Sequence, residues 1–312
     1  MTASKPLVVV FGATGNQGGS VLRTLAELPE SYTVRAVTRS TKSKTAQELA
    51  AQYPLVKWVE ADLETPSTLS QAVANADIVF GVTQFFQPSV LSAVGTNEDA
   101  EFLQGKNIID TCVAENVGYI VFSTLPSAKK LSNGKITEVL HFEGKYKIQE
   151  YLFAQPIDSA VIQMGIYFQN NIQSASWNES GDTVVISFPG DVDRKLPYAD
   201  VNRDTGPYVK YIIDNRKEAK GKVFPVVSGY YSTTDIANAL TKVTGLKATA
   251  AELPTNAFGD KDLEGMFELL KSHEVFAESC SWDTNDDVPP MFTSPEIFWE
   301  TSGFQGPPTT LE

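Results

Sequence analysis

The sequence predicts an α/β protein in which a Rossmann-like, doubly wound parallel sheet is joined to a smaller, irregular α/β lobe. Short apolar runs alternate with helical patterns through the first half of the 312 residues, and this alternation is typical of βαβ units and a parallel sheet. A glycine-rich stretch lies between the first apolar run and the first helical pattern. In doubly wound folds this turn is where a nucleotide binds.

Five strands are expected in the first half, with helices between them. Residues 7–11 form a continuous, largely β-branched run, which suits a strand buried on both faces. A further helix begins with Thr65 as its N-cap and Pro66 at its first position. The other strands are expected at residues 33–37, 56–59, 78–82 and 119–122, and the other helices at residues 21–28, 45–52 and about 97–115.

After residue 155 the pattern becomes less regular. Residues 1–155 are expected to form a nucleotide-binding core, to which strand and helix segments return up to about residue 240. Residues 156–312 are expected to form a mixed lobe, interleaved with that core and packed over its ligand-binding edge, with residues 305–312 lacking a fixed structure. Strands are expected at residues 160–164, 183–187 and 223–227, and helical pieces at residues 260–272 and 294–301.

Composition excludes several classes of protein. Hydrophobic residues make up 42% of the chain and charged residues 20%, which is ordinary globular composition and excludes disorder and fibrous repeats. No apolar stretch approaches the ~18 residues that a bilayer crossing needs, and no secretory signal is expected at the N-terminus. The net charge of −13 repels phosphate backbones, so direct nucleic-acid binding is not expected. Because no apolar stretch is long enough, a membrane is not an expected partner either.

The cysteines and histidines indicate no metal centre. Cys112 and Cys280 are far apart, and His141 and His273 are the only histidines, so no metal-ligand pattern is present. The cytoplasm is the expected compartment, because so few cysteines suit a reducing environment. The oligomeric state is left open.

Three glycines follow the first strand at a spacing of three and three residues. Glycine permits a tight turn and lets the backbone approach a pyrophosphate, and the following helix N-terminus offers free N–H groups to the anion. The alternative is a glycine-rich turn without a ligand. The residues expected to contact the nucleotide here are Gly12, Thr14, Gly15, Asn16, Gln17 and Gly18.

The end of the second strand favours NADP(H) over NAD(H). An NAD site usually has an acidic residue there for the ribose 2′-hydroxyl, whereas this sequence has Thr38 and Arg39, followed by Lys42. The planar guanidinium of Arg39 suits a 2′-phosphate and stacks on adenine; the alternative is a solvated basic loop. Asp62 and Leu63, after the third strand, are placed to hold the adenine, although Asp62 is equally suited to a simple helix start.

Further segments are more specific than the glycines alone. They are residues 9–19, residues 34–39, the sequence His-Phe-Glu-Gly-Lys at 141–145 and the sequence Tyr-Phe-Gln-Asn at 167–170. Together they resemble the NmrA-like family, an atypical branch of the short-chain dehydrogenases, over roughly residues 5–300. The resemblance implies a Rossmann domain that binds NADP(H). Its best-known members sense the NADP redox ratio and bind partner proteins, including a transcription factor; others are reductases, some of them in secondary metabolism.

The resemblance also directs attention to one pair of residues. Ordinary short-chain dehydrogenases carry Tyr-x-x-x-Lys on one helical face, and the matching pair in this sequence is His141 and Lys145. Lys145 is then expected to hold the nicotinamide ribose. His141 replaces the tyrosine as general acid and base, since histidine titrates near neutral pH, or it has only a structural role. Ser123, at the end of the fifth strand, is placed to hydrogen-bond a substrate carbonyl.

Loops after the fourth and sixth strands are expected to wall the nicotinamide. Aromatic residues at the carboxyl edge of a parallel sheet usually line a pocket. The residues expected beside the cofactor are Thr83, Gln84, Tyr167, Phe168 and Asn170, and those expected beside the substrate are Phe85, Phe86 and Tyr167. Gln84 and Gln169 depart from the pattern of the family's regulators, which indicates a pocket reshaped for a particular substrate.

Two functional hypotheses follow. The first is an NADP(H)-dependent oxidoreductase that acts on a bulky, largely apolar small molecule of secondary metabolism, by net reduction or by a redox-assisted rearrangement or cyclisation. The second is a non-catalytic NADP(H) sensor that binds a partner protein. A sensor of this kind could act in the nucleus as well as in the cytoplasm. The sequence favours the enzyme.

Overall fold

The computed structural model describes residues 5–93, 99–276 and 293–308. Within these ranges a seven-stranded parallel sheet runs in the order β11-β6-β5-β4-β1-β2-β3, so the doubly wound α/β prediction is confirmed. The strands are β1 (Leu7–Val10), β2 (Thr33–Thr38), β3 (Lys57–Glu60), β4 (Ile78–Gly81), β5 (Tyr119–Thr124), β6 (Asp158–Met164) and β11 (Val223–Val226).

Helices cover both faces of this sheet because its strands are apolar on both sides. Along β1, Val8 and Val10 pack with one helical layer and Val9 packs with the other. The first layer contains α1 (Asn16–Ala26) and α9 (Thr205–Asp214), and the second contains α3 (Leu69–Val73), α5 (Ala100–Ala114) and α7 (Leu140–Phe153). The smaller helical elements of this part are α2 (Lys44–Gln52), η1 (Pro66–Thr68), α4 (Pro88–Leu91), α6 (Ala128–Leu131) and α10 (Arg216–Ala219).

The lobe contains two three-stranded sheets, ordered β12-β10-β7 and β13-β9-β8. The strands are β7 (Ile166–Tyr167), β8 (Ala175–Trp177), β9 (Val184–Pro189), β10 (Leu196–Ala199), β12 (Gly229–Tyr231) and β13 (Ala248–Leu253), and the helices are α8 (Gln169–Gln173), α11 (Thr233–Thr244), α12 (Lys261–Ser272) and α13 (Pro295–Ser302). Its core includes Phe298 and Trp299, both 2% exposed.

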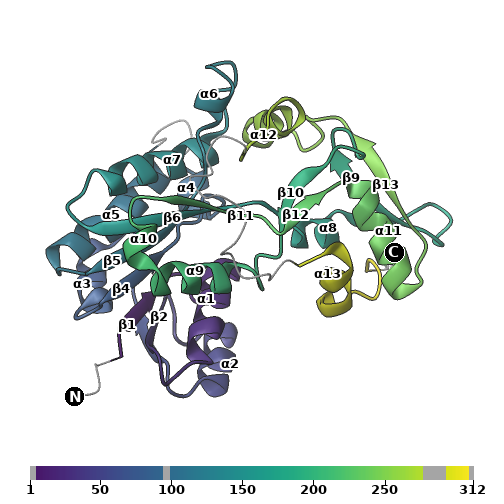
Figure 1. Cartoon of the computed structure of the whole chain (residues 1–312). Helices are drawn as coiled ribbons and strands as arrows, with labels where there is room; N and C mark the ends of the chain where they lie inside the picture. The colour runs from purple at the N-terminus through teal and green to yellow at the C-terminus, as the bar shows by residue number, and fades with distance from the viewer. Residues whose placement is uncertain (1–4, 94–98, 277–292, 309–312) are drawn as a thin grey trace.

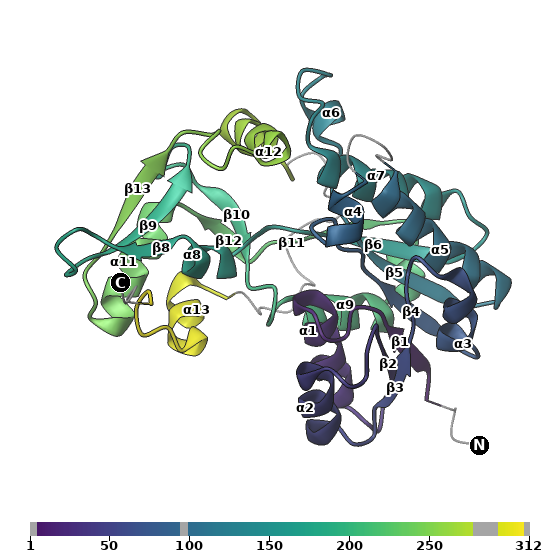
Figure 2. The same ribbon diagram turned by 180° about the vertical axis from the view of Figure 1, so that it is seen from behind.

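The chain passes between the two parts more than once. β6, α9 and β11 belong to the large sheet and its layers, whereas α11 packs in the core of the lobe. Figures 1 and 2 show the two parts side by side, with α12 on the edge of the lobe that faces α7. At this side of the molecule, Asp262 of α12 contacts His141 of α7.

Several details differ from the sequence prediction. Thr65 occupies the N-cap position before Pro66, but its side chain makes no capping hydrogen bond. Residues 305–308, which were expected to lack a fixed structure, pack against Trp177, whose indole N–H donates to the carbonyl of Pro307 at 2.9 Å; residues 309–312 and Cys280 lie outside the described residues. In the described ranges, no helix combines the length and apolar character that a bilayer crossing needs.

Candidate functional site

The glycine loop has the close backbone packing of a phosphate-binding turn. Gly12 has a φ of +62°, and its carbonyl accepts the N–H of Gly15 at 2.8 Å. A Cβ on Gly18 would lie 2.3 Å from the same carbonyl oxygen, so only glycine fits. Gly15 caps α1 without a side-chain bond, and the N–H groups of the first helical turn have no acceptor within the helix. These features fit a dinucleotide pyrophosphate.

The loop after β2 presents basic groups and is held by an acid that the sequence prediction missed. Arg39 and Lys42 are exposed, whereas Thr38 is buried. Glu60, at the end of β3, accepts the backbone N–H and the hydroxyl of Thr41, each at 2.7 Å. These two hydrogen bonds, the backbone one first, lower the pKa of Glu60. The carboxylate therefore fixes the loop on which Arg39 is exposed.

The adenine-side candidates lie on the next loop. Asp62 is exposed, and its Oδ1 accepts the N–H of Glu64 at 2.9 Å. Leu63 is half-buried, and its carbonyl accepts the side-chain amide of Asn107 at 2.8 Å. Both residues follow β3 directly, at the carboxyl edge of the sheet.

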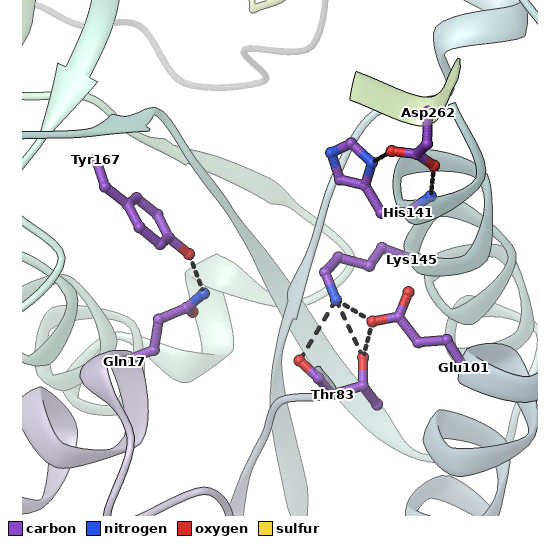
Figure 3. Close-up of polar contacts among 7 residues, drawn as sticks. All are labelled: Gln17, Thr83, Glu101, His141, Lys145, Tyr167 and Asp262. Atoms are coloured by element: carbon purple, nitrogen blue, oxygen red, sulfur yellow. Dashed lines mark hydrogen bonds and ion pairs between the residues drawn. The ribbon is translucent and has the colours of Figure 1, made fainter. Parts of the chain in front are cut away.

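Lys145 belongs to a buried polar cluster at the carboxyl end of β4. Its ammonium donates to the Thr83 hydroxyl at 3.2 Å and to the Thr83 carbonyl at 3.4 Å, and it forms an ion pair with Glu101 of α5 (Figure 3). The Thr83 hydroxyl also donates to Glu101 at 2.9 Å. The Glu101 side chain is only 1% exposed, and its Oε2 has no hydrogen-bond partner among the described residues. Sequence reasoning missed Glu101, because nothing in its own helix marks it.

His141 lies one turn before Lys145 on α7. Its ring Nδ1 contacts Oδ1 of Asp262, and its backbone N–H donates to Oδ2 of the same carboxylate at 3.0 Å (Figure 3). Asp262 comes from α12 of the lobe, 121 residues away in the chain, and it too was missed. The Asp262 carboxylate therefore orients the His141 ring, an arrangement that suits either a structural histidine or one that transfers protons.

Aromatic residues surround the other sides of this histidine. The ring centroids of Phe85 and Phe86 lie 5.8 and 5.4 Å from that of His141. Phe85 is buried, whereas Phe86 is 48% exposed and offers an apolar surface beside the imidazole. Across the site, the Gln17 amide donates to the Tyr167 hydroxyl at 2.8 Å (Figure 3). Burial raises the pKa of Tyr167, so its hydroxyl stays protonated at neutral pH.

Not every predicted residue reaches this region with an available side chain. Phe168 is fully buried and stacks on Tyr198 and Phe298 in the core of the lobe, so its ring has no free face for a nicotinamide. Ser123 is 1% exposed, which gives no support to its role at a substrate carbonyl. Gln84 and Asn170 are exposed. The side-chain packing of the lobe, which no local pattern encodes, accounts for the position of Phe168.

Comparison with known proteins identifies relatives along the whole chain. The profile of the NmrA-like family matches residues 4–295. The chain is similar to the NmrA-like family domain-containing oxidoreductase ptmS of Penicillium ochrochloron, with 29% identity over 296 residues, 89% of this chain and 85% of that protein. It is 31% identical over 259 residues to the oxidoreductase cpsB of Aspergillus campestris, covering 78% and 74% of the two chains.

A solved structure shows the same fold. The crystal structure of NmrA, a negative transcriptional regulator, in complex with NADP superposes with a TM-score of 0.73 at 19% identity, covering 96% of this chain and 92% of that one. The profile match over residues 4–295 and the relative at 31% identity indicate the same family. The chain belongs to the NmrA-like family.

Proposed function

We propose that this protein is an NADPH-dependent oxidoreductase that acts on a bulky, largely apolar small molecule. One observation carries the proposal: His141 and Lys145 lie one turn apart on α7, each with a carboxylate partner, at the sheet edge that also holds the glycine loop. Relatives named as oxidoreductases support it, as does a relative of the same fold that binds NADP.

The chain's residues divide the work of binding and proton transfer. The first turn of α1 holds the pyrophosphate and Arg39 holds the 2′-phosphate. Lys145 holds the nicotinamide ribose, and Thr83 and Glu101 fix its ammonium where that ribose binds. The bound cofactor supplies a hydride. His141 donates the accompanying proton to the substrate, and Phe86 and Tyr167 present apolar surface and a hydroxyl to it.

The test is nucleotide titration combined with turnover. We expect NADPH to quench or shift the fluorescence of the purified protein at lower concentrations than NADH, and we expect NADPH oxidation with one or more members of a panel of ketones, enals, imines and quinones. His141→Ala should lower turnover at least 100-fold, the contribution of a general acid, while NADPH affinity is retained. His273→Ala is the matched control, because that half-buried histidine is the C-cap residue of α12.

A second candidate is a sensor that binds NADP(H) and a partner protein without turnover. It is favoured by the absence of a tyrosine four residues before Lys145 and by the similarity in fold to a transcriptional regulator. Tight NADPH binding, no turnover across the panel and a partner affinity that depends on the nucleotide would support the sensor. Failure to bind either nucleotide would contradict both candidates.

A further inference from the structure

His141 is held by a carboxylate from the opposite part of the molecule. Asp262 of α12 contacts both the backbone N–H and the ring Nδ1 of His141, and the two side chains are 8% and 11% exposed. An imidazole has two nitrogens. With Nδ1 on Asp262, Nε2 is the nitrogen that faces away from the carboxylate (Figure 3).

The approach of α12 to α7 depends on a glycine. The Asp260 carboxylate caps α12 by accepting the N–H groups of Asp262 at 2.8 Å and Leu263 at 3.1 Å, which fixes Asp262 in the first turn. Gly265 follows one turn later, where a Cβ would lie 2.9 Å from Cγ2 of the fully buried Val139. Val139 directly precedes α7, so a larger residue at position 265 would push the lobe helix away from His141.

The charges around the imidazole come from few groups. Lys145 is the next ionisable group on its face of α7, and its ammonium is paired with Glu101 of α5. The segment after β4 contributes the uncharged rings of Phe85 and Phe86. Among the described carboxylates, Asp262 is therefore the one that contacts the imidazole.

We propose that Asp262 is a positioning residue that keeps a proton on Nδ1 of His141 and so makes Nε2 the donor in catalysis. The inference rests on the proposed function. For a carbonyl substrate, the carbonyl carbon accepts the hydride from NADPH while its oxygen takes the Nε2 proton, giving an alcohol and NADP⁺. His141 is left neutral, with its Nδ1 proton held by Asp262, and regains a proton at Nε2 from solvent.

Nitrogen NMR tests the positioning without turnover. The chain has only two histidines, so a His273→Gln background leaves one imidazole in a long-range ¹H–¹⁵N spectrum. We expect neutral His141 to carry its proton on Nδ1. In Asp262→Asn, the side-chain amide oxygen still accepts the backbone N–H of His141, and the amide NH₂ group faces ring Nδ1. Because the NH₂ group is a donor, Nδ1 should become an acceptor and the ring proton should move to Nε2. An Nε2 proton without the substitution, or no change on substitution, would overturn the proposal.

Kinetics test the consequence for proton transfer. Asp262→Asn should lower kcat about 100-fold with NADPH affinity unchanged within about twofold. Glu264→Gln, which removes one acidic charge from the same helix, should behave like the native protein. Equal kcat values for the two variants would contradict the role of Asp262. If the native protein shows no turnover but neutral His141 carries its proton on Nδ1, the result would contradict the proposed function and leave the positioning by Asp262 intact.

A third pair of variants tests the geometry while both reacting residues are kept. Gly265→Ala should displace α12 and lower kcat about tenfold or more, with the Nδ1 signal shifted toward the Asp262→Asn position. Gly265→Ala combined with Val139→Ala removes the methyl group that the new Cβ would meet, so it should restore much of the loss. A Gly265→Ala protein with native kcat and native spectrum would show that the close approach of α12 is not required.

Discussion

At the scale of single residues, we propose that Arg39 makes the site prefer NADPH over NADH. Its guanidinium is exposed at the end of β2, and the loop that carries it is held by Glu60. We predict that Arg39→Ala weakens NADPH binding about 10- to 100-fold, the effect of one or two charge-assisted hydrogen bonds, and leaves NADH binding unchanged. Fluorescence titration with both nucleotides measures the ratio.

The control for Arg39 must remove a positive charge elsewhere on the same sheet. Lys57→Ala is suitable, because Lys57 begins β3 at the edge opposite the glycine loop and is exposed. If both variants lose NADPH affinity equally, general electrostatic attraction explains the effect and Arg39 has no specific role.

Burial should make the thiol of Cys112 unreactive in the folded protein. It is fully buried in α5, and burial raises the pKa of its thiol to about 12, so at pH 8 about one molecule in ten thousand carries the thiolate. In a Cys280→Ser background, we predict no labelling of the native protein by a thiol reagent at pH 8 and one thiol per chain after unfolding in denaturant. Rapid labelling of the native variant would show that α5 opens readily.

At the scale of elements, neighbouring glycines of α1 should differ sharply in tolerance. A Cβ on Gly18 would meet the Gly12 carbonyl oxygen at 2.3 Å, whereas one on Gly19 would meet the mobile end of Arg23 at 3.2 Å. We predict that Gly18→Ala lowers the free energy of unfolding by about 1–3 kcal/mol and abolishes nucleotide binding. Gly19→Ala should change stability by no more than about 1 kcal/mol. Denaturant unfolding and NADPH titration measure both effects.

Element prediction succeeded where one strand carries its own signal. The runs in β1 and β4 are apolar, and those in β2 and β5 are rich in β-branched residues, so a strand is the simplest outcome for each. The lobe gave weaker signals: β10 contains Pro197 and β13 is alanine-rich, and both residue types are depleted in strands. These strands form because lobe packing overrides local preference, and that packing is not visible in a short window of sequence.

At the scale of the whole molecule, the same limit applies to the candidate site. The glycine loop and the His-x-x-x-Lys pair could be predicted because each lies within a few residues of chain. Asp262 and Glu101 could not, because each reaches α7 only through tertiary packing. The partner carboxylates are therefore set by the fold, whereas the glycine loop and the His141–Lys145 pair are visible in the local sequence.

A second buried carboxylate joins the two parts of the molecule. Asp204, at the start of α9, is 2% exposed. It accepts the Thr293 hydroxyl and the Asp200 N–H, each at 2.7 Å, and it contacts the Ser228 hydroxyl. Burial is the largest cause that raises its pKa, and the negative charge of Asp200 acts in the same direction. The folded state therefore binds the Asp204 proton more tightly than the unfolded chain does.

This raised pKa fixes the sign of a stability change with pH. The stabilisation that comes from protonated Asp204 is complete below the unfolded pKa of about 3.9 and is lost as the pH rises through the folded pKa. We predict that the unfolding free energy of the native protein, minus that of Asp204→Asn, decreases as the pH is raised from 5 to 8. Urea unfolding at each pH measures this difference, and Glu115→Gln corrects for the loss of one exposed acidic charge. A difference that does not decrease with pH would contradict the raised pKa of Asp204. It would show instead that the hydrogen bonds from Ser228 and Thr293 stabilise the ionised carboxylate at the junction of the two parts.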